Sequence, residues 1–127
     1  MIATAYMPPA LLIHGAVAAV WLYEGLWCKL LDGEPRQKDV VAAVPKYGPA
    51  VGRAFLQVLG VVEVILAIWV LWGFAPLACA IAQTALLVCL NTCGICFARH
   101  LIHDPPGMLV KNFGFLVLAW VSAAIRL

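Results

Sequence analysis

The residue whose chemistry is most unusual for its surroundings is Glu63, a carboxylic acid inside the apolar stretch 51–72. If this stretch is a helix that enters a membrane near residue 51, Glu63 lies roughly 18 Å deep at 1.5 Å per residue, near the bilayer centre. A carboxylate at that depth must be protonated or paired, because an isolated charge in hydrocarbon is costly. Helical spacing predicts an inward-facing stripe of small or polar residues made of Arg53, Gln57, Gly60, Glu63 and Ala67. Glu63 is therefore either a proton-transfer or ligand-binding carboxylate, or a buried hydrogen-bonding group that fixes helix packing.

Thiol chemistry is the second possibility. Cys93 and Cys96 form a CxxC pair near the end of the apolar stretch 77–98. Cys28 is expected at a similar depth and His100 follows soon after, so these four residues are the candidate ligands of a soft metal ion. The alternative is that the cysteines act as small apolar side chains. Five cysteines, all in or beside apolar stretches, do not indicate a disulfide framework.

A second acidic residue, Glu24, lies about two turns before the end of the first apolar stretch. Lys29 follows five residues later, off the helical face of Glu24, and is expected to reach out to the membrane interface. Glu24 therefore needs another partner, and Lys111 is the preferred one. The sequence predicts a structural polar cluster of Glu24, Lys111, Asn112, Asn91 and Glu63.

His14 is expected to be a hydrogen-bonded core residue. A haem held by two histidines is not supported, because His100 and His103 are expected on the opposite side of the membrane. The chain contains no serine-hydrolase arrangement, nucleotide-binding glycine loop or zinc-protease motif. The individual residues therefore do not name a reaction.

The composition sets the fold class. The chain has 127 residues, of which 65% are hydrophobic and 11% charged, whereas soluble domains have about 25% charged residues. This predicts an all-α integral membrane protein, a four-helix bundle in one domain (residues 1–127), because helices satisfy every backbone polar group within a span. The expected spans are about 8–31, 51–72, 77–98 and 108–125, and a short interfacial helix is expected at 36–44 in the first loop. A net charge of +2 gives no indication of a nucleic-acid partner.

The basic residues predict the orientation. One side of the membrane receives seven of the eight basic residues, Lys29, Arg36, Lys38, Lys46, Arg53, Arg99 and Lys111, and the other receives only Arg126. Loops 32–50 and 99–107 are therefore expected in the cytoplasm and both termini outside.

The first 23 residues carry no Lys or Arg, so a cleaved signal peptide is not expected. Asp104, followed by two prolines and a glycine, is expected to stop the third span and to cap the turn into the fourth.

These residues resemble the DoxX-like family of small four-helix membrane proteins. The resemblance rests on the block 21–27 with Lys29, on Gly60 and Glu63, on Asn91, and above all on the block 104–113. These landmarks span nearly the whole chain in family order. The CxxC pair departs from the family pattern.

The resemblance implies a function and a location. Members of the wider family resemble subunits of quinone-linked oxidoreductases and terminal oxidases. It therefore implies a non-catalytic accessory subunit of a membrane-bound redox complex in the inner (plasma) membrane of a bacterium. Such a subunit would pack against larger subunits and line a lipid or quinone site, with no cofactor of its own. The alternative is a thiol-quinone oxidoreductase that uses Cys93 and Cys96, with Glu63 in proton transfer.

Overall fold

The protein is described by a computed structural model covering residues 7–31, 49–102 and 104–125, and these residues are helical apart from short turns. The elements in chain order are α2 (Ala10–Leu22), the π-helix η1 (Tyr23–Leu30), α4 (Pro49–Trp72), α5 (Pro76–Ala98), the 3-10 turn η2 (Arg99–Leu101) and α6 (Pro105–Ala124). Among the described residues, four helical segments are long and apolar enough to cross a membrane: α2 continued by η1, α4, α5 and α6. The predicted all-α, four-span fold is confirmed; the predicted interfacial helix at 36–44 lies outside the described residues.

Each of the four described α-helices begins at a proline or directly after one. Pro9 precedes α2, and its carbonyl accepts from the backbone N–H groups of Leu12 and Ile13. α6 begins at Pro105, earlier than the predicted Met108, because a proline with fixed φ suits the first helical turn and lacks only a donor that would be unpaired there. The Asp104 carboxylate caps this turn by accepting from the Gly107 N–H at 3.1 Å, as the sequence predicts.

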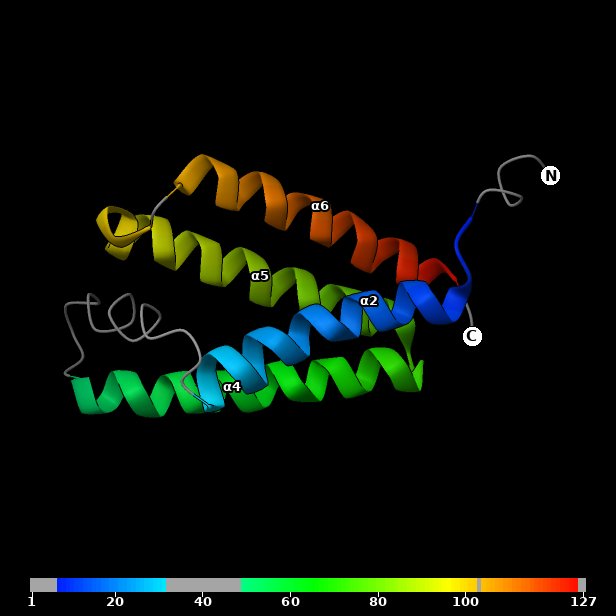
Figure 1. Ribbon diagram of the computed structural model, residues 1–127, viewed down its shortest axis with the longest axis horizontal. Helices are drawn as coiled ribbons and strands as arrows, with labels where there is room; N and C mark the ends of the chain where they lie inside the picture. Colours follow the sequence, from blue (N-terminus) through cyan, green and yellow to red (C-terminus); the bar gives the residue numbers. More distant parts are fainter. Residues whose placement is uncertain (1–6, 32–48, 103, 126–127) are drawn as a thin grey trace.

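The helices form two antiparallel pairs. α2 and η1 lie along α4, α5 lies along α6, and α2 also contacts α6 (Figure 1). The beginning of α2 and the end of α6 are at one end of the bundle, and the start of α4 and the α5–α6 connection are at the other (Figure 1). This is the arrangement expected of four spans that alternate in direction.

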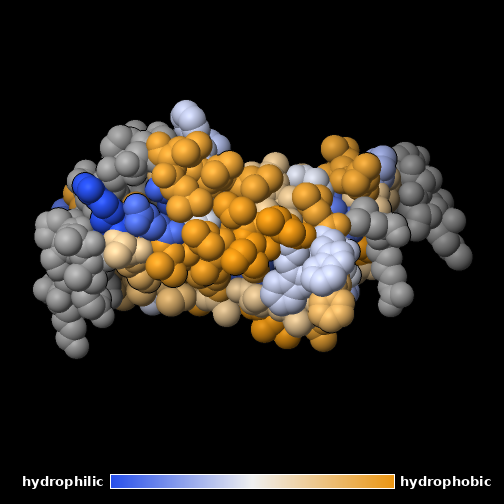
Figure 2. All heavy atoms as spheres, turned by 90° about the horizontal axis from the view of Figure 1, so that it is seen from below, coloured by the Kyte–Doolittle hydropathy of each residue, from blue (hydrophilic) through white to orange (hydrophobic). Residues whose placement is uncertain are grey.

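The apolar core lies where the pairs meet, in the half of the bundle nearer the α4–α5 turn. Its buried residues are Val17, Ala18, Trp21, Leu66, Ala67, Val70, Cys79 and Ala119. Trp21 of α2 contacts both α5 and α6. Its indole N–H donates to Gln83 Oε1 at 2.8 Å, and its ring packs edge-on against Phe115 with the ring centroids 5.4 Å apart. Most of the surface seen in Figure 2 is apolar, with hydrophilic side chains gathered near one end, as a membrane-embedded bundle requires.

Candidate functional site

The helices η1 and α4 approach each other closely at a pair of glycines. A Cβ atom on Gly25 would lie 2.6 Å from the Gly60 carbonyl oxygen and 2.9 Å from Glu63 Cβ. A Cβ atom on Gly60 would lie 3.0 Å from the Gly25 carbonyl oxygen and from side-chain atoms of Lys29 and Leu30. Small residues at such a crossing let two membrane helices pack backbone to backbone. The contact places the side chains of Lys29 and Leu30 against the middle of α4.

A buried ion pair lies at this crossing. Lys29 Nζ is 3.0 Å from Glu63 Oε2, and the exposed fractions of the two side chains are only 6% and 1%. Lys29 Nζ is also 3.7 Å from a carboxylate oxygen of Glu24, whose side chain is 40% exposed, and it donates to the Glu24 backbone carbonyl at 3.3 Å. We call Glu24, Lys29 and Glu63 the charged triad. A lysine held between two carboxylates satisfies the requirement that an intramembrane charge be paired.

The charged triad depends on the π-helical winding of η1. In an α-helix, residues five apart are rotated by about 140°, so Glu24 and Lys29 would face different directions. In a π-helix the hydrogen bonds join residues five apart, as the Leu31 N–H does with the Leu26 carbonyl at 2.9 Å. This winding brings Glu24 and Lys29 onto one face. π-Helical segments are often found at functional sites.

Two predictions about these charges are wrong. Glu24 was expected to pair with Lys111, but its carboxylate lies near Lys29, and Lys111 is exposed on α6 without an ion pair to any described residue. Lys29 was expected to reach the membrane interface, but it is buried against Glu63. Both errors have one cause, because the prediction assumed α-helical geometry through residues 24–29.

The predicted inward-facing stripe on α4 is correct only in part. Gly60, Glu63 and Ala67 are buried, whereas Arg53 and Gln57 are exposed. The end of η1 explains the difference, because its last residues, Lys29 and Leu30, lie against Gly60. Arg53 and Gln57 lie one to two turns nearer the start of α4 than Gly60, outside the part of α4 that η1 covers.

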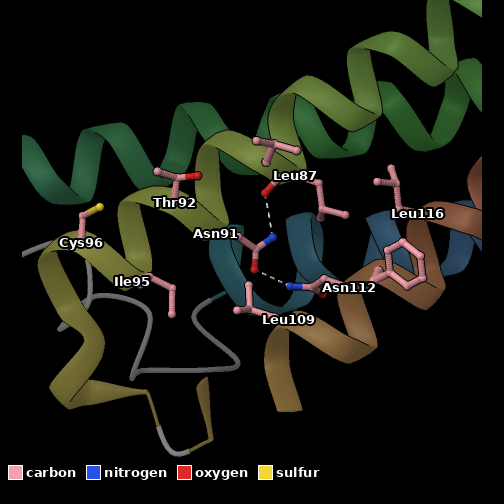
Figure 3. A pocket seen from close by; sticks show the side chains of 10 residues that line it. Leu87, Asn91, Thr92, Ile95, Cys96, Leu109, Asn112 and Leu116 are labelled. Carbon is pink, nitrogen blue, oxygen red and sulfur yellow. Dashed lines mark hydrogen bonds between the residues drawn. The ribbon is translucent and has the colours of Figure 1, made fainter. Parts of the chain in front are cut away.

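The predicted asparagines do meet, but away from the charged triad. Asn112 Nδ2 donates to Asn91 Oδ1 at 2.6 Å, and Asn91 Nδ2 donates to the Leu87 carbonyl at 2.7 Å (Figure 3). This bridge between α5 and α6 borders an open hollow of about 420 Å³, which we call the α5/α6 groove. The groove is lined by Leu87, Val88, Asn91, Thr92, Ile95, Cys96, Leu109, Asn112, Phe113 and Leu116.

The four predicted metal ligands are not brought together in one site. Cys93 and Cys96 are exposed on α5, Cys28 is buried in η1, and His100 is exposed in η2. Within the described ranges no three His, Cys, Asp or Glu side chains are placed to hold one metal ion. Glu63, the proton carrier of the alternative thiol-quinone mechanism, is engaged by Lys29 between η1 and α4.

His14 has both ring nitrogens in hydrogen bonds. Nε2 lies 2.8 Å from the Ile125 carbonyl, and Nδ1 lies 2.8 Å from Ser122 Oγ. Because a carbonyl only accepts, Nε2 carries the proton and Nδ1 accepts from the serine hydroxyl. His14 thereby joins the start of α2 to the end of α6, as a hydrogen-bonded core histidine. Sequence reasoning did not find its partner Ser122, since nothing in an isolated serine indicates a partner more than 100 residues away.

The model of the DoxX-like family matches residues 18–120, which is most of the chain. The chain belongs to the DoxX-like family. No curated protein and no solved structure matches the chain. The DoxX-like match contains the charged triad and the asparagine bridge, whereas the His14–Ser122 hydrogen bond lies outside the matched range. The DoxX-like chain is thus a multi-pass membrane protein whose two polar sites lie on different helix pairs.

Proposed function

We propose that this DoxX-like protein is a non-catalytic accessory subunit of a membrane-bound, quinone-linked redox complex and packs against larger membrane subunits. The redox assignment rests on the family, whose wider membership resembles subunits of quinone-linked enzymes. The subunit role rests on the surface of α5 and α6. The family resemblance supports a bacterial inner membrane as the location. The basic residues support an orientation with both termini outside and loops 32–50 and 99–107 in the cytoplasm.

The observation that carries the subunit role is the unequal burial of the four spans. In the span formed by α2 with η1, and in that of α4, 39% of the residues in the most apolar window are buried within the chain. In the spans of α5 and α6, only 17% and 11% are buried. The uncovered surface includes the polar ammonium group of Lys111 on α6. Lipid tails offer such groups no hydrogen bonds, whereas a neighbouring membrane helix does.

Lys111 identifies the part of this surface that a partner would cover. It lies six residues into α6, about 9 Å from the first residue along the helix axis. A charge facing lipid is costly, and an acidic residue on a neighbouring subunit would remove that cost. If the ammonium instead reaches the headgroups, Lys111 needs no partner. The two possibilities predict different results for a Lys111 variant.

Purification from native membranes tests the proposal. The protein, tagged at its chromosomal copy and extracted in mild detergent, should co-purify with larger membrane subunits and with bound quinone. Lys111→Met should reduce the recovered partner at least fivefold, because the partner's carboxylate would lose its counter-charge. Arg53→Met is the matched control, since Arg53 is an exposed basic residue on α4. A protein that elutes alone at native abundance would show that the proposal is wrong.

A further inference from the structure

The α5/α6 groove opens on the outer surface of the bundle. All of its lining residues come from α5 and α6, and several of them are exposed: Val88 (54%), Leu109 (45%) and Phe113 (68%). Its walls are mostly hydrocarbon, and the two asparagines use part of their hydrogen-bonding capacity on each other and on the Leu87 carbonyl (Figure 3). In a bilayer a groove of this kind faces the lipid tails.

A cation lies at the loop end of the same helix face. Thr92, Ile95 and Cys96 line the groove, and Arg99 follows them at spacings of seven, four and three residues. These spacings keep side chains on one face of a helix. Arg99 has right-handed helical φ and ψ (−54°, −38°), so the register continues into η2. The apolar span ends at Cys96, so the exposed Arg99 lies just beyond the end of the span.

The length of the groove matches one leaflet. From Leu87 to Arg99 is twelve residues, about 18 Å along the helix axis at 1.5 Å per residue. Half of a typical hydrocarbon core is about 15 Å. A chain that begins beside Arg99 and follows the groove would therefore end near the bilayer centre.

We propose that the α5/α6 groove binds one acyl chain of an anionic phospholipid, whose phosphate is held by Arg99. A guanidinium pairs with a phosphodiester through two parallel hydrogen bonds. A headgroup with a net negative charge keeps the full attraction to Arg99, whereas the quaternary ammonium of phosphatidylcholine offsets part of it. The acidic residue at the start of α6, Asp104, already uses its carboxylate to cap that helix. The second acyl chain would remain in the bulk lipid.

The lipid and the proposed protein partner occupy different sides of α6. Lys111 is two residues from both Leu109 and Phe113, a step of about 200° around a helix. It therefore faces away from the groove. The phospholipid site does not depend on the accessory role, and it can be tested on the isolated chain.

Native mass spectrometry of the purified chain tests the proposal. The protein would be delipidated in mild detergent and titrated with phosphatidylglycerol or with phosphatidylcholine carrying the same acyl chains. One phosphatidylglycerol per chain should bind, at least tenfold more tightly than phosphatidylcholine. Arg99→Gln should weaken phosphatidylglycerol binding about tenfold, as expected for losing a hydrogen bond to a charged group. Arg53→Gln, which removes an exposed arginine from α4, should change it less than twofold.

A second pair of variants tests the groove itself. Leu116→Trp fills part of the groove and should reduce binding of phosphatidylglycerol, whereas Val117→Trp places the same side chain at an exposed position outside the groove and should not. If Leu116→Trp does not fold, the Arg99 variant still decides. Equal affinity for the two lipids, equal losses in the two arginine variants, or a co-purified quinone or peptide in the groove would overturn the proposal.

Discussion

Removing the ammonium group of Lys29 is the sharpest perturbation that the structure offers. In Lys29→Met the unbranched methionine keeps most of the side-chain bulk against Gly60, so the close helix crossing is retained. What is lost is the only cation within 4 Å of Glu63 among the described residues, and Glu63 is 1% exposed. Breaking a buried ion pair by removing one partner costs about 3–5 kcal/mol, because the remaining charge stays buried without compensation. We expect Lys29→Met to lower the free energy of unfolding by this amount.

The other members of the charged triad should respond by smaller amounts. Glu63→Gln keeps an oxygen that can accept from Lys29, and Glu24 remains as a carboxylate 3.7 Å from the ammonium. Glu24→Gln should cost about 1 kcal/mol or less, because Glu24 is 40% exposed and its contact is long. The double variant Lys29→Met, Glu63→Gln should be more stable than Lys29→Met alone, because it no longer buries an unpaired charge.

Unfolding in detergent, followed by far-UV circular dichroism, measures these differences. A loss of 3–5 kcal/mol corresponds to a fall in the unfolding midpoint of roughly 10 °C or more for a chain of this size. Arg53→Met is the control for the loss of a positive charge at an exposed site. If Lys29→Met melts with the wild type, or if the double variant is no more stable than Lys29→Met, the ion pair does not stabilise this crossing and the reasoning fails.

Two further predictions follow from the packing. Gly25→Ala should lower the free energy of unfolding by about 1–3 kcal/mol, because its Cβ would meet the Gly60 carbonyl. Gly114→Ala is the control, and because a Cβ there would have nothing within 4 Å, it should leave the free energy of unfolding unchanged or slightly raised. Equal effects of the two variants in a denaturation series would contradict the close approach. A small thiol reagent in mild detergent should modify three cysteines rapidly and protect two until the chain unfolds, and rapid modification of all five would contradict the burial. The three reactive cysteines should be Cys89, Cys93 and Cys96, and the two protected ones Cys28 and Cys79.

The spans were predictable from sequence because each is set by local composition. Four apolar stretches of membrane-spanning length, separated by prolines and charged residues, are sufficient to define an all-α membrane bundle. The Asp104 cap was predictable for the same reason, since it joins residues only three apart. The meeting of Asn91 and Asn112 was predictable from their similar depth in neighbouring spans.

The charged triad was not predictable, because it depends on a change from α-helical to π-helical winding that no residue type in the sequence indicates. Tyr23–Leu30 contains no proline, and its single glycine is tolerated in any membrane helix. In the structure, Gly25 and Gly60 meet in the close contact between η1 and α4, and Lys29 lies 3.0 Å from Glu63, which no local sequence signal predicts. A glycine on each of two spans, close to an acid or a base, is the signal that could have suggested this crossing.

The two helix pairs differ in how their polar groups are satisfied, and this difference limits where the protein can act. In the pair formed by η1 and α4, the buried ammonium of Lys29 is paired with carboxylates inside the chain, and the helices contact each other at glycines. In the pair formed by α5 and α6, polar and basic side chains remain exposed around a groove. An internally paired half and an open half fit the proposed accessory role, in which one surface meets other membrane components. Mutations in the charged triad should therefore change stability first, whereas mutations on α5 and α6 should change what the protein binds.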